Sequence, residues 1–273
     1  MHVWTNSPEA FGGQRSRSVL ERLGDLVTDL GMQLEARRAS YTGDMPAPVS
    51  FGDAADQFAH RFLCGELVAF GLGIPVISEE DKESQSDPRP ARYWLIDPVD
   101  GTASYRGGFA GYVTQLALME DGQPILAAIY VPASDELFLA ERAAGSVCNG
   151  IRLSLAEPSG RRRFIDNYPE PRATGARLYG RIGCDGYVES GSLGLKICRI
   201  ADGTAEIFFK DVILRDWDIA PAALILEEAG GTLTTTSGNP FVYSGDFVKS
   251  GVIATANKTL AAEVAAAMKS VSV

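Results

Sequence analysis

Asp97 and Asp100 stand three residues apart, directly after the apolar run 93–96, whose length and aromatic composition are typical of a buried strand. Two carboxylates this close, with no positive neighbour, repel each other unless they share a proton or a cation. Such hard oxygen ligands suit Mg²⁺, which proteins usually hold with a few carboxylates, water and substrate phosphate. Gly101 and Thr102 follow where a helix could begin, and free backbone N–H groups there could hold an anion. The stretch indicates a metal–phosphate site, with a simple turn as the alternative, because Asp-Pro and Asp-Gly are common turn dipeptides.

Two further acidic positions lie at the ends of predicted elements. Residues 74–78 form a short predicted strand that leads into Glu79, so two successive strands each deliver carboxylates. Asp218 lies in the first turn of a predicted helix, 217–228, where a carboxylate is favourable with the helix dipole even as a plain cap. The D-x-D pair there could suggest an aspartate-nucleophile phosphatase, but Ala220 stands where those enzymes need Thr or Val. An acidic loop alone is more often solvated, so it is the strand context that favours a site.

Charge and hydropathy limit the partners. The net charge of −10 disfavours nucleic acid or an anionic membrane as the main partner. It does not disfavour a phosphate, because bound cations can invert the local field. Residues 1–18 have no apolar core like that of a signal peptide, and no apolar run is long enough to span a membrane. A cytoplasmic protein is therefore expected, and its charge is compatible with a small phosphorylated substrate.

The sequence lacks the residues that several other classes of enzyme require. The four cysteines include no C-x-x-C pair, which argues against a zinc site or a disulfide framework. The only histidines, His2 and His60, have no flanking motif of a Ser-His-Asp triad or a phosphohistidine enzyme. No P-loop sequence occurs either. Carboxylate and metal chemistry is what remains.

The order of predicted elements indicates how these residues are positioned. Asp53 is expected to cap a second long helix after a loop over residues 39–52. The pattern predicts an α/β (α+β) protein with an N-terminal α+β half, 1–147, that carries most of the acids, and a C-terminal α/β half, 148–273, joined near a basic patch at 159–163. The expected helices are 17–38, 53–70, 190–202, 217–228 and 260–268, and the expected strands are 74–78, 93–96, 112–119, 124–130, 137–140, 146–148, 204–209, 232–236 and 248–254.

Three segments together resemble the inositol monophosphatase superfamily of Mg²⁺-dependent, lithium-sensitive phosphatases. Residues 77–80, ISEE, are similar to its first acidic motif; residues 94–102, WLIDPVDGT, to its D-P-x-D-G-T signature; and residues 217–231, WDIAPAALILEEAGG, to its second signature, W-D-x-A followed by A-G-G. The order and spacing agree from about residue 53 to the C-terminus. The resemblance implies a layered αβαβα sandwich of the inositol monophosphatase and fructose-1,6-bisphosphatase type, and a homodimer.

The resemblance also implies how the acids would work around two or three Mg²⁺ ions. Thr102 Oγ, with Glu79 or Asp56, would orient a metal-activated water for in-line attack on the phosphate. The N–H groups of Gly101 and Thr102 would hold that phosphate. By motif position, the implied metal ligands are Glu79, Asp97, the carbonyl of Val99, Asp100 and Asp218.

The substrate side matches the family less closely. Lys210 or Asp211 falls where members often present a Glu to inositol hydroxyls, and Ser192 lies in a loosely matching loop. Lys196 resembles the 3′(2′),5′-bisphosphate nucleotidase branch, although Ala103 stands where that branch usually has Lys. We therefore predict a phosphomonoesterase for an inositol or sugar monophosphate. The alternatives are a nucleotidase acting on 3′-phosphoadenosine 5′-phosphate and a non-catalytic binding relative.

Overall fold

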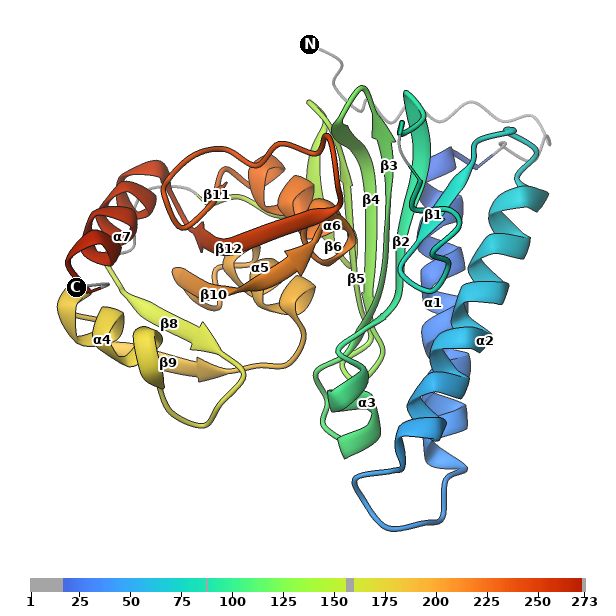
Figure 1. Cartoon of the computed structure of the whole chain (residues 1–273), viewed down its shortest axis with the longest axis horizontal. Helices are drawn as coiled ribbons and strands as arrows, with labels where there is room; N and C mark the ends of the chain where they lie inside the picture. The colour runs from blue at the N-terminus through green and yellow to red at the C-terminus, as the bar shows by residue number, and fades with distance from the viewer. Residues whose placement is uncertain (1–16, 87, 156–159, 272–273) are drawn as a thin grey trace, which may run out of the picture.

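Helices and sheets alternate in five layers (Figure 1). The structure, a computed structural model, describes residues 17–86, 88–155 and 160–271, so that residues 1–16 with His2, and Ser159 of the basic patch, lie outside the described residues. One outer pair of helices covers the first sheet, a second pair lies between the two sheets, and a third covers the second sheet. This αβαβα order confirms the predicted fold. The three pairs are α1 (Val19–Ala39) with α2 (Val49–Ala69), α5 (Leu193–Ala201) with α6 (Asp216–Glu228), and α4 (Ala173–Ile182) with α7 (Lys258–Val271).

The two sheets differ in topology. In the first, β1 pairs parallel with β2 and all later neighbours are antiparallel; in the second, β8 is parallel to both of its neighbours. The first sheet runs β1 (Val76–Ser78), β2 (Arg92–Asp100), β3 (Val113–Glu120), β4 (Gln123–Val131), β5 (Glu136–Glu141), β6 (Gly145–Cys148), β7 (Ile151–Arg152). The second runs β11 (Thr232–Thr234), β12 (Val248–Thr255), β10 (Ile207–Arg215), β8 (Arg163–Asp166), β9 (Gly186–Glu189). The first sheet thus continues past residue 148, and the division into two halves at that point stays a prediction.

The long N-terminal helices form largely as their sequence predicts. Ser18 and Glu21 exchange side-chain and backbone hydrogen bonds in a capping box that starts α1. The predicted start of α2 at Asp53 is wrong, because the helix begins at Val49 and Asp53 lies exposed inside it. Gly52, which suggested a loop, is instead a point of close packing: a Cβ there would lie 2.7 Å from the Arg106 side chain. None of the helices in the described ranges combines the length and apolarity needed to cross a bilayer.

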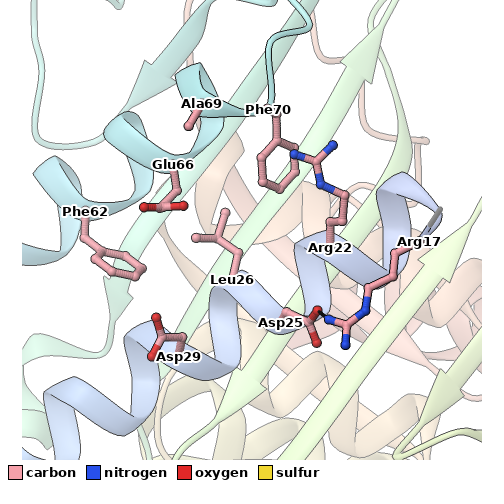
Figure 2. A pocket seen from close by; sticks show the side chains of 9 residues that line it. All are labelled: Arg17, Arg22, Asp25, Leu26, Asp29, Phe62, Glu66, Ala69 and Phe70. Carbon is pink, nitrogen blue, oxygen red and sulfur yellow. Dashed lines mark hydrogen bonds and ion pairs between the residues drawn. The ribbon is translucent and has the colours of Figure 1, made fainter. Parts of the chain in front are cut away.

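A cavity of about 500 Å³ lies between the start of α1 and the end of α2 (Figure 2). Its two arginines already have partners: Arg17 pairs with Asp25, and the Arg22 guanidinium lies 3.8 Å from the centre of the Phe70 ring. None of the predicted site residues lines it. The chemistry therefore has to be sought elsewhere.

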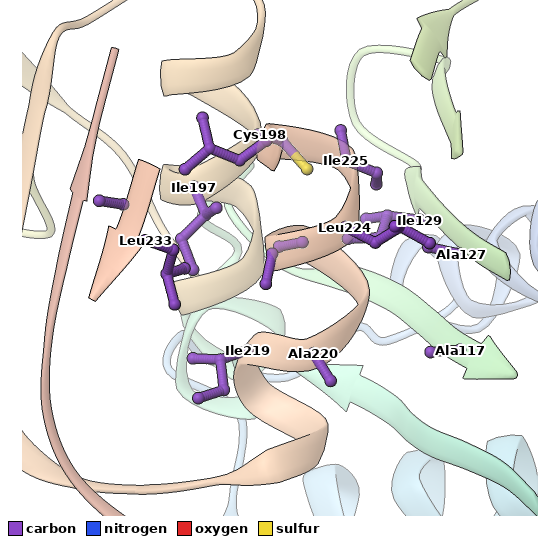
Figure 3. Packing of buried hydrophobic residues seen from close by; sticks show 14 of the residues in the cluster. Ala117, Ala127, Ile129, Ile197, Cys198, Ile219, Ala220, Leu224, Ile225 and Leu233 are labelled. Carbon is purple, nitrogen blue, oxygen red and sulfur yellow. The ribbon is translucent and has the colours of Figure 1, made fainter. Parts of the chain in front are cut away.

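Small side chains line the contact between α6 and the first sheet (Figure 3). Ala117 of β3 and Ala127 of β4 are fully buried in the same cluster as Ala220 and Leu224 of α6. The distance between packed elements depends on the side chains at their contact, and alanines permit a close approach. The first turn of α6, which carries Asp218, is thereby held against β2 and β3.

Candidate active site

A bulge in β2 turns both central aspartates to one side. Asp97 pairs with Gln115 and Asp100 with Val113, so the segment of β2 between these pairs has one residue more than the facing segment of β3. In a regular strand, residues three apart face opposite sides of the sheet. With the extra residue, both carboxylates reach the same amide: Gln115 Nε2 lies 3.4 Å from Asp97 Oδ2 and 3.3 Å from Asp100 Oδ2. Both aspartates are buried. Pro98 lies within the bulge, where a missing N–H is tolerated.

Glu79 and Asp218 complete a group of four carboxylates. Ser78 of β1 is in register with Ile96, and Glu79 N donates to the Ile96 carbonyl at 3.3 Å, so Glu79 emerges beside Asp97. Asp218 comes from α6, where its carboxylate accepts a 2.7 Å hydrogen bond from Arg215 N. The ends of two strands thus meet the start of a helix that lies more than 100 residues later in the chain.

The electrostatics of this group fit a bound cation. Burial raises the pKa of Asp97 well above its usual range, and the charges of Glu79, Asp100 and Asp218 raise it further. Burial and then the Asp100 charge raise the pKa of Asp218 to about 8. Asp97 Oδ1 is buried without a hydrogen-bond partner. Among the described residues, no three acidic, histidine or cysteine side chains are yet gathered at metal-binding spacing, so a cation would have to draw these carboxylates together.

Thr102 and Asp56 lie next to this group. Gly101 has a φ of 95°, a conformation that favours glycine, and it turns the chain from β2 into the short helix α3 (Thr102–Gly107). Thr102 Oγ1 can donate to the Val99 carbonyl at 3.2 Å or to Asp56 Oδ1 at 3.3 Å. Burial, and then the charges of Glu80 and Glu79, raise the pKa of Asp56 to about 7. The predicted catalytic threonine and its acidic partner are therefore in contact.

The start of α5 lies against Asp100. Gly194 N donates to Asp100 Oδ2 at 2.7 Å, and Ser192 caps the helix by accepting from Leu195 N at 3.2 Å. A Cβ at Gly194 would lie 2.4 Å from Gln115 Oε1, so this approach requires glycine. Ser192 is buried in this contact. The loop predicted to face the substrate therefore supports Asp100, which is a predicted metal ligand.

The remaining predicted substrate residues are placed differently. Lys196 is only 4% exposed; its ammonium donates to the Gly191 carbonyl, and burial lowers its pKa to about 8. Lys210 donates to Asp166 Oδ1 and Asn167 Oδ1, both at 2.7 Å. Asp211 is exposed, and no hydrogen bond or ion pair between described residues joins it to the other candidates. The two lysines thus already bind acceptors within the protein.

Comparison with known proteins agrees with this geometry. A sequence model of the inositol monophosphatase family matches residues 28–272. This chain belongs to that family. A Nus factor SuhB from Xylella fastidiosa is 33% identical over 198 residues, 70% of each chain. Inositol monophosphatase 1 from Bos taurus is 27% identical over 88% of this chain and 91% of its own, and the 3′(2′),5′-bisphosphate nucleotidase CysQ from Buchnera aphidicola is 33% identical over 74% and 78%.

Solved structures agree on the fold. An IMPase from Thermotoga maritima has a TM-score of 0.75 at 24% identity and covers 92% of this chain and 97% of its own. Together with the named phosphatases among the relatives, these matches identify the chain as a phosphatase of the inositol monophosphatase family, which is generally metal-dependent. They leave its substrate open, because the relatives carry different names.

Sequence reasoning missed two side chains that this family member places at or beside the site. Gln115 is fully buried between the aspartates, and a lone amide in the apolar segment 112–119 was the available signal. Arg89 lies in the linker before β2 and forms a buried ion pair with Asp216, the first residue of α6. The basic character of that linker gave no sign of a buried partner more than 100 residues away.

The raised pKa values predict how stability changes with pH in the metal-free enzyme. A carboxylate whose pKa is higher in the folded than in the unfolded state adds stability below its unfolded pKa, and that stability is lost as pH rises through the folded value. For Asp218 the window runs from the usual 3.8 to about 8. In EDTA, the melting temperature should fall between about pH 5.5 and about pH 8.5, and Mg²⁺ should reverse most of the fall. Differential scanning fluorimetry at several pH values measures this.

Asp218→Asn is the matched variant, because it removes one titrating group and keeps the shape. Its metal-free melting temperature should depend less on pH than that of the wild type. A wild-type melting temperature that rises with pH across the window, in EDTA, would show that the four carboxylates are not crowded as described.

Proposed function

We propose that this chain is a Mg²⁺-dependent phosphomonoesterase that releases phosphate from a small polyol phosphate, an inositol or sugar monophosphate. The observation that carries the proposal is the group of four mutually repelling carboxylates, with Asp97 and Asp100 buried and Asp97 Oδ1 without a hydrogen-bond partner among the described residues, directly beside the Thr102–Asp56 pair. Carboxylates that are crowded together are stabilised by a nearby positive charge. Positive charge also stabilises a phosphoryl group while its ester bond is broken. One cation site would serve both.

The proposed ligands are Glu79, Asp97, Asp100 and Asp218 with the Val99 carbonyl, and two or three ions would fit the charge of this set. When bound, Mg²⁺ supplies positive charge to the phosphoryl group and lowers the pKa of water next to it. The protein's own groups would do the rest. Gly101 and Thr102 would hold the phosphate through their N–H groups, since the left-handed turn at Gly101 places these amides next to the aspartates.

Thr102 and Asp56 are proposed to accept the proton of the attacking water. The attacking water would donate to Thr102 Oγ1, which in turn donates to Asp56 Oδ1, 3.3 Å away. A base works best when its pKa lies near the working pH. Without a bound cation, burial and the charges of Glu80 and Glu79 raise the pKa of Asp56 to about 7. Glu79 would orient the same water from the other side. Ser192 would contact the substrate from the start of α5.

The bisphosphate nucleotidase is the second candidate, and the identity with CysQ favours it. A second phosphate would need additional positive charge. The nearby lysines give little of it, because Lys196 is buried and Lys210 pairs with Asp166, and Asp211 adds a negative charge. We therefore rank the monophosphate first. A non-catalytic binding role is third, because none of the implied ligands is replaced in this sequence. A homodimer, lithium sensitivity, a cytoplasmic location and the lack of a nucleic-acid partner stay predictions.

Phosphate release across a substrate panel tests the proposal. With Mg²⁺ present, myo-inositol 1-phosphate or a sugar monophosphate should be hydrolysed faster than 3′-phosphoadenosine 5′-phosphate, and EDTA should stop the reaction. Preference for the bisphosphate would move the chain to the second candidate. Mg²⁺ binding without release from any substrate in the panel would contradict the proposed hydrolase and favour the binding role.

A further inference from the structure

Gln115 occupies the centre of the carboxylate group although no acid or base chemistry requires it. It lies directly opposite Asp97 in the ladder between β2 and β3, and its side chain is completely buried. Its Nε2 faces three acceptors: Asp97 Oδ2 at 3.4 Å, Asp100 Oδ2 at 3.3 Å and the Trp217 carbonyl at 3.1 Å. A flipped amide would set its oxygen against these three oxygens, so the observed orientation is the one that donates.

The Trp217 carbonyl is free for this contact because of a proline. In a helix, the carbonyl of residue 217 would accept from the N–H of residue 221, but Pro221 has none. A buried carbonyl without a partner is costly. Gln115 supplies the missing donor and thereby joins β3 to the first turn of α6, one residue before Asp218. A single amide thus contacts two of the four carboxylates and the residue before a third.

A neutral donor is suited to this place. A Lys or Arg would neutralise the aspartates and compete with a cation, whereas an amide orients them and leaves their charge. It contacts only one oxygen of each aspartate. Among the described residues, Asp97 Oδ1 has no hydrogen-bond partner, and Asp100 Oδ1 lies 3.4 Å from Leu193 N, while the Ser192 side chain also bonds to the Asp100 carboxylate. The Oδ1 atoms of both aspartates are therefore available to bind a cation.

We infer that Gln115 is a positioning residue that sets the Mg²⁺ affinity of the site by fixing Asp97 and Asp100 relative to the first turn of α6. The inference rests on the proposed metal site. Partners that orient metal-binding carboxylates typically change metal affinity about 10–100-fold when they are removed. The effect on turnover at saturating Mg²⁺ should be much smaller, because Gln115 does not itself reach the substrate.

The test is the Mg²⁺ concentration that gives half of the maximal thermal shift, compared between wild type and Gln115→Met, which keeps the volume and loses the hydrogen bonds. This concentration should rise at least about tenfold. Phosphate release measured against Mg²⁺ concentration should show the same displacement and recover at high Mg²⁺. Gln115→Asn keeps an amide but is one methylene shorter, so its Mg²⁺ midpoint should lie between those of the wild type and Gln115→Met. It replaces Gln115→Met in the test if the methionine variant does not fold.

Thr114→Val is the matched control. Thr114 is the neighbouring residue on β3, also fully buried, and its hydroxyl donates to the Val27 carbonyl on the opposite side of the sheet. It should lower stability and leave the Mg²⁺ midpoint unchanged. A Gln115 variant that folds and keeps its midpoint within twofold overturns the inference. A wild type without any Mg²⁺-dependent shift would instead contradict the proposed metal site itself.

Discussion

Asp97→Asn should reduce phosphate release by on the order of 10²–10⁴-fold, the range observed when a group that acts in the transition state is removed. Asparagine keeps the shape of the side chain but loses the negative charge and one anionic oxygen, so the cation would be held weakly. The metal-free variant should be at least as stable as the wild type, because a neutral amide replaces a carboxyl whose charged form is disfavoured by burial and by three neighbouring acids. Phosphate release and the melting temperature in EDTA measure the two effects on one preparation.

Asp29→Asn makes the same chemical change at an exposed position of α1, away from the candidate residues. It should leave both quantities unchanged. An Asp97→Asn enzyme that is folded and retains near-normal activity would remove Asp97 from the proposed ligands, and with it the central assumption of the site.

Arg89→Ala should lower the free energy of unfolding by about 3–5 kcal/mol, the cost typical of removing one partner of a buried ion pair. The Arg89 side chain is 7% exposed, and Asp216 is completely buried. The guanidinium also donates to the carbonyls of Tyr243, Gly245 and Asp246 at 3.2, 2.9 and 2.6 Å, and it lies 3.7 Å from the centre of the Phe247 ring. Without it, Asp216 would keep only Lys249, at 3.3 Å.

Chemical denaturation of wild type and variant measures this loss. Arg92→Ala is the matched control, since Arg92 pairs with Glu120 at 3.4 Å and both side chains are about half exposed. That surface pair should contribute less than about 1 kcal/mol. Asp216→Asn in the Arg89→Ala background should restore part of the stability, because it removes the unpaired charge. Equal losses for the two arginine variants would contradict the role of Arg89.

The acidic motifs could be predicted because each is local: a strand end, a tight turn or a helix start. Their convergence at one site was predicted from the resemblance to the inositol monophosphatase superfamily, which the order and spacing of the motifs indicated. The β2 bulge was not predictable, because Pro98 and Gly101 suggested an earlier end of the strand, near residue 96, whereas the ladder with β3 continues to Asp100. The start of α2 was wrong for a related reason: Gly52 breaks helices in isolation but here permits contact with Arg106.

Elements that depend on distant partners gave little local signal. No helix or strand was predicted between residues 163 and 189, where the structure has β8, α4 and β9. β8 has only four residues, and its partner β10 lies about 40 residues later in the chain. Gln115 and Arg89 belong to the same class, since each has partners more than 100 residues away. Such contacts are determined by tertiary packing, which a single sequence does not display.

The one-residue excess in β2 between Asp97 and Asp100 has a consequence for how the gene can vary. Many side chains around the bulge could be substituted without a change in the backbone conformation. If the bulge straightened without a change in length, regular alternation would send one carboxylate to the opposite face of the sheet. A single-codon deletion would keep both carboxylates on one face, but it would remove Pro98 or Val99, and the Val99 carbonyl is a proposed ligand. This interval should therefore keep its length through divergence.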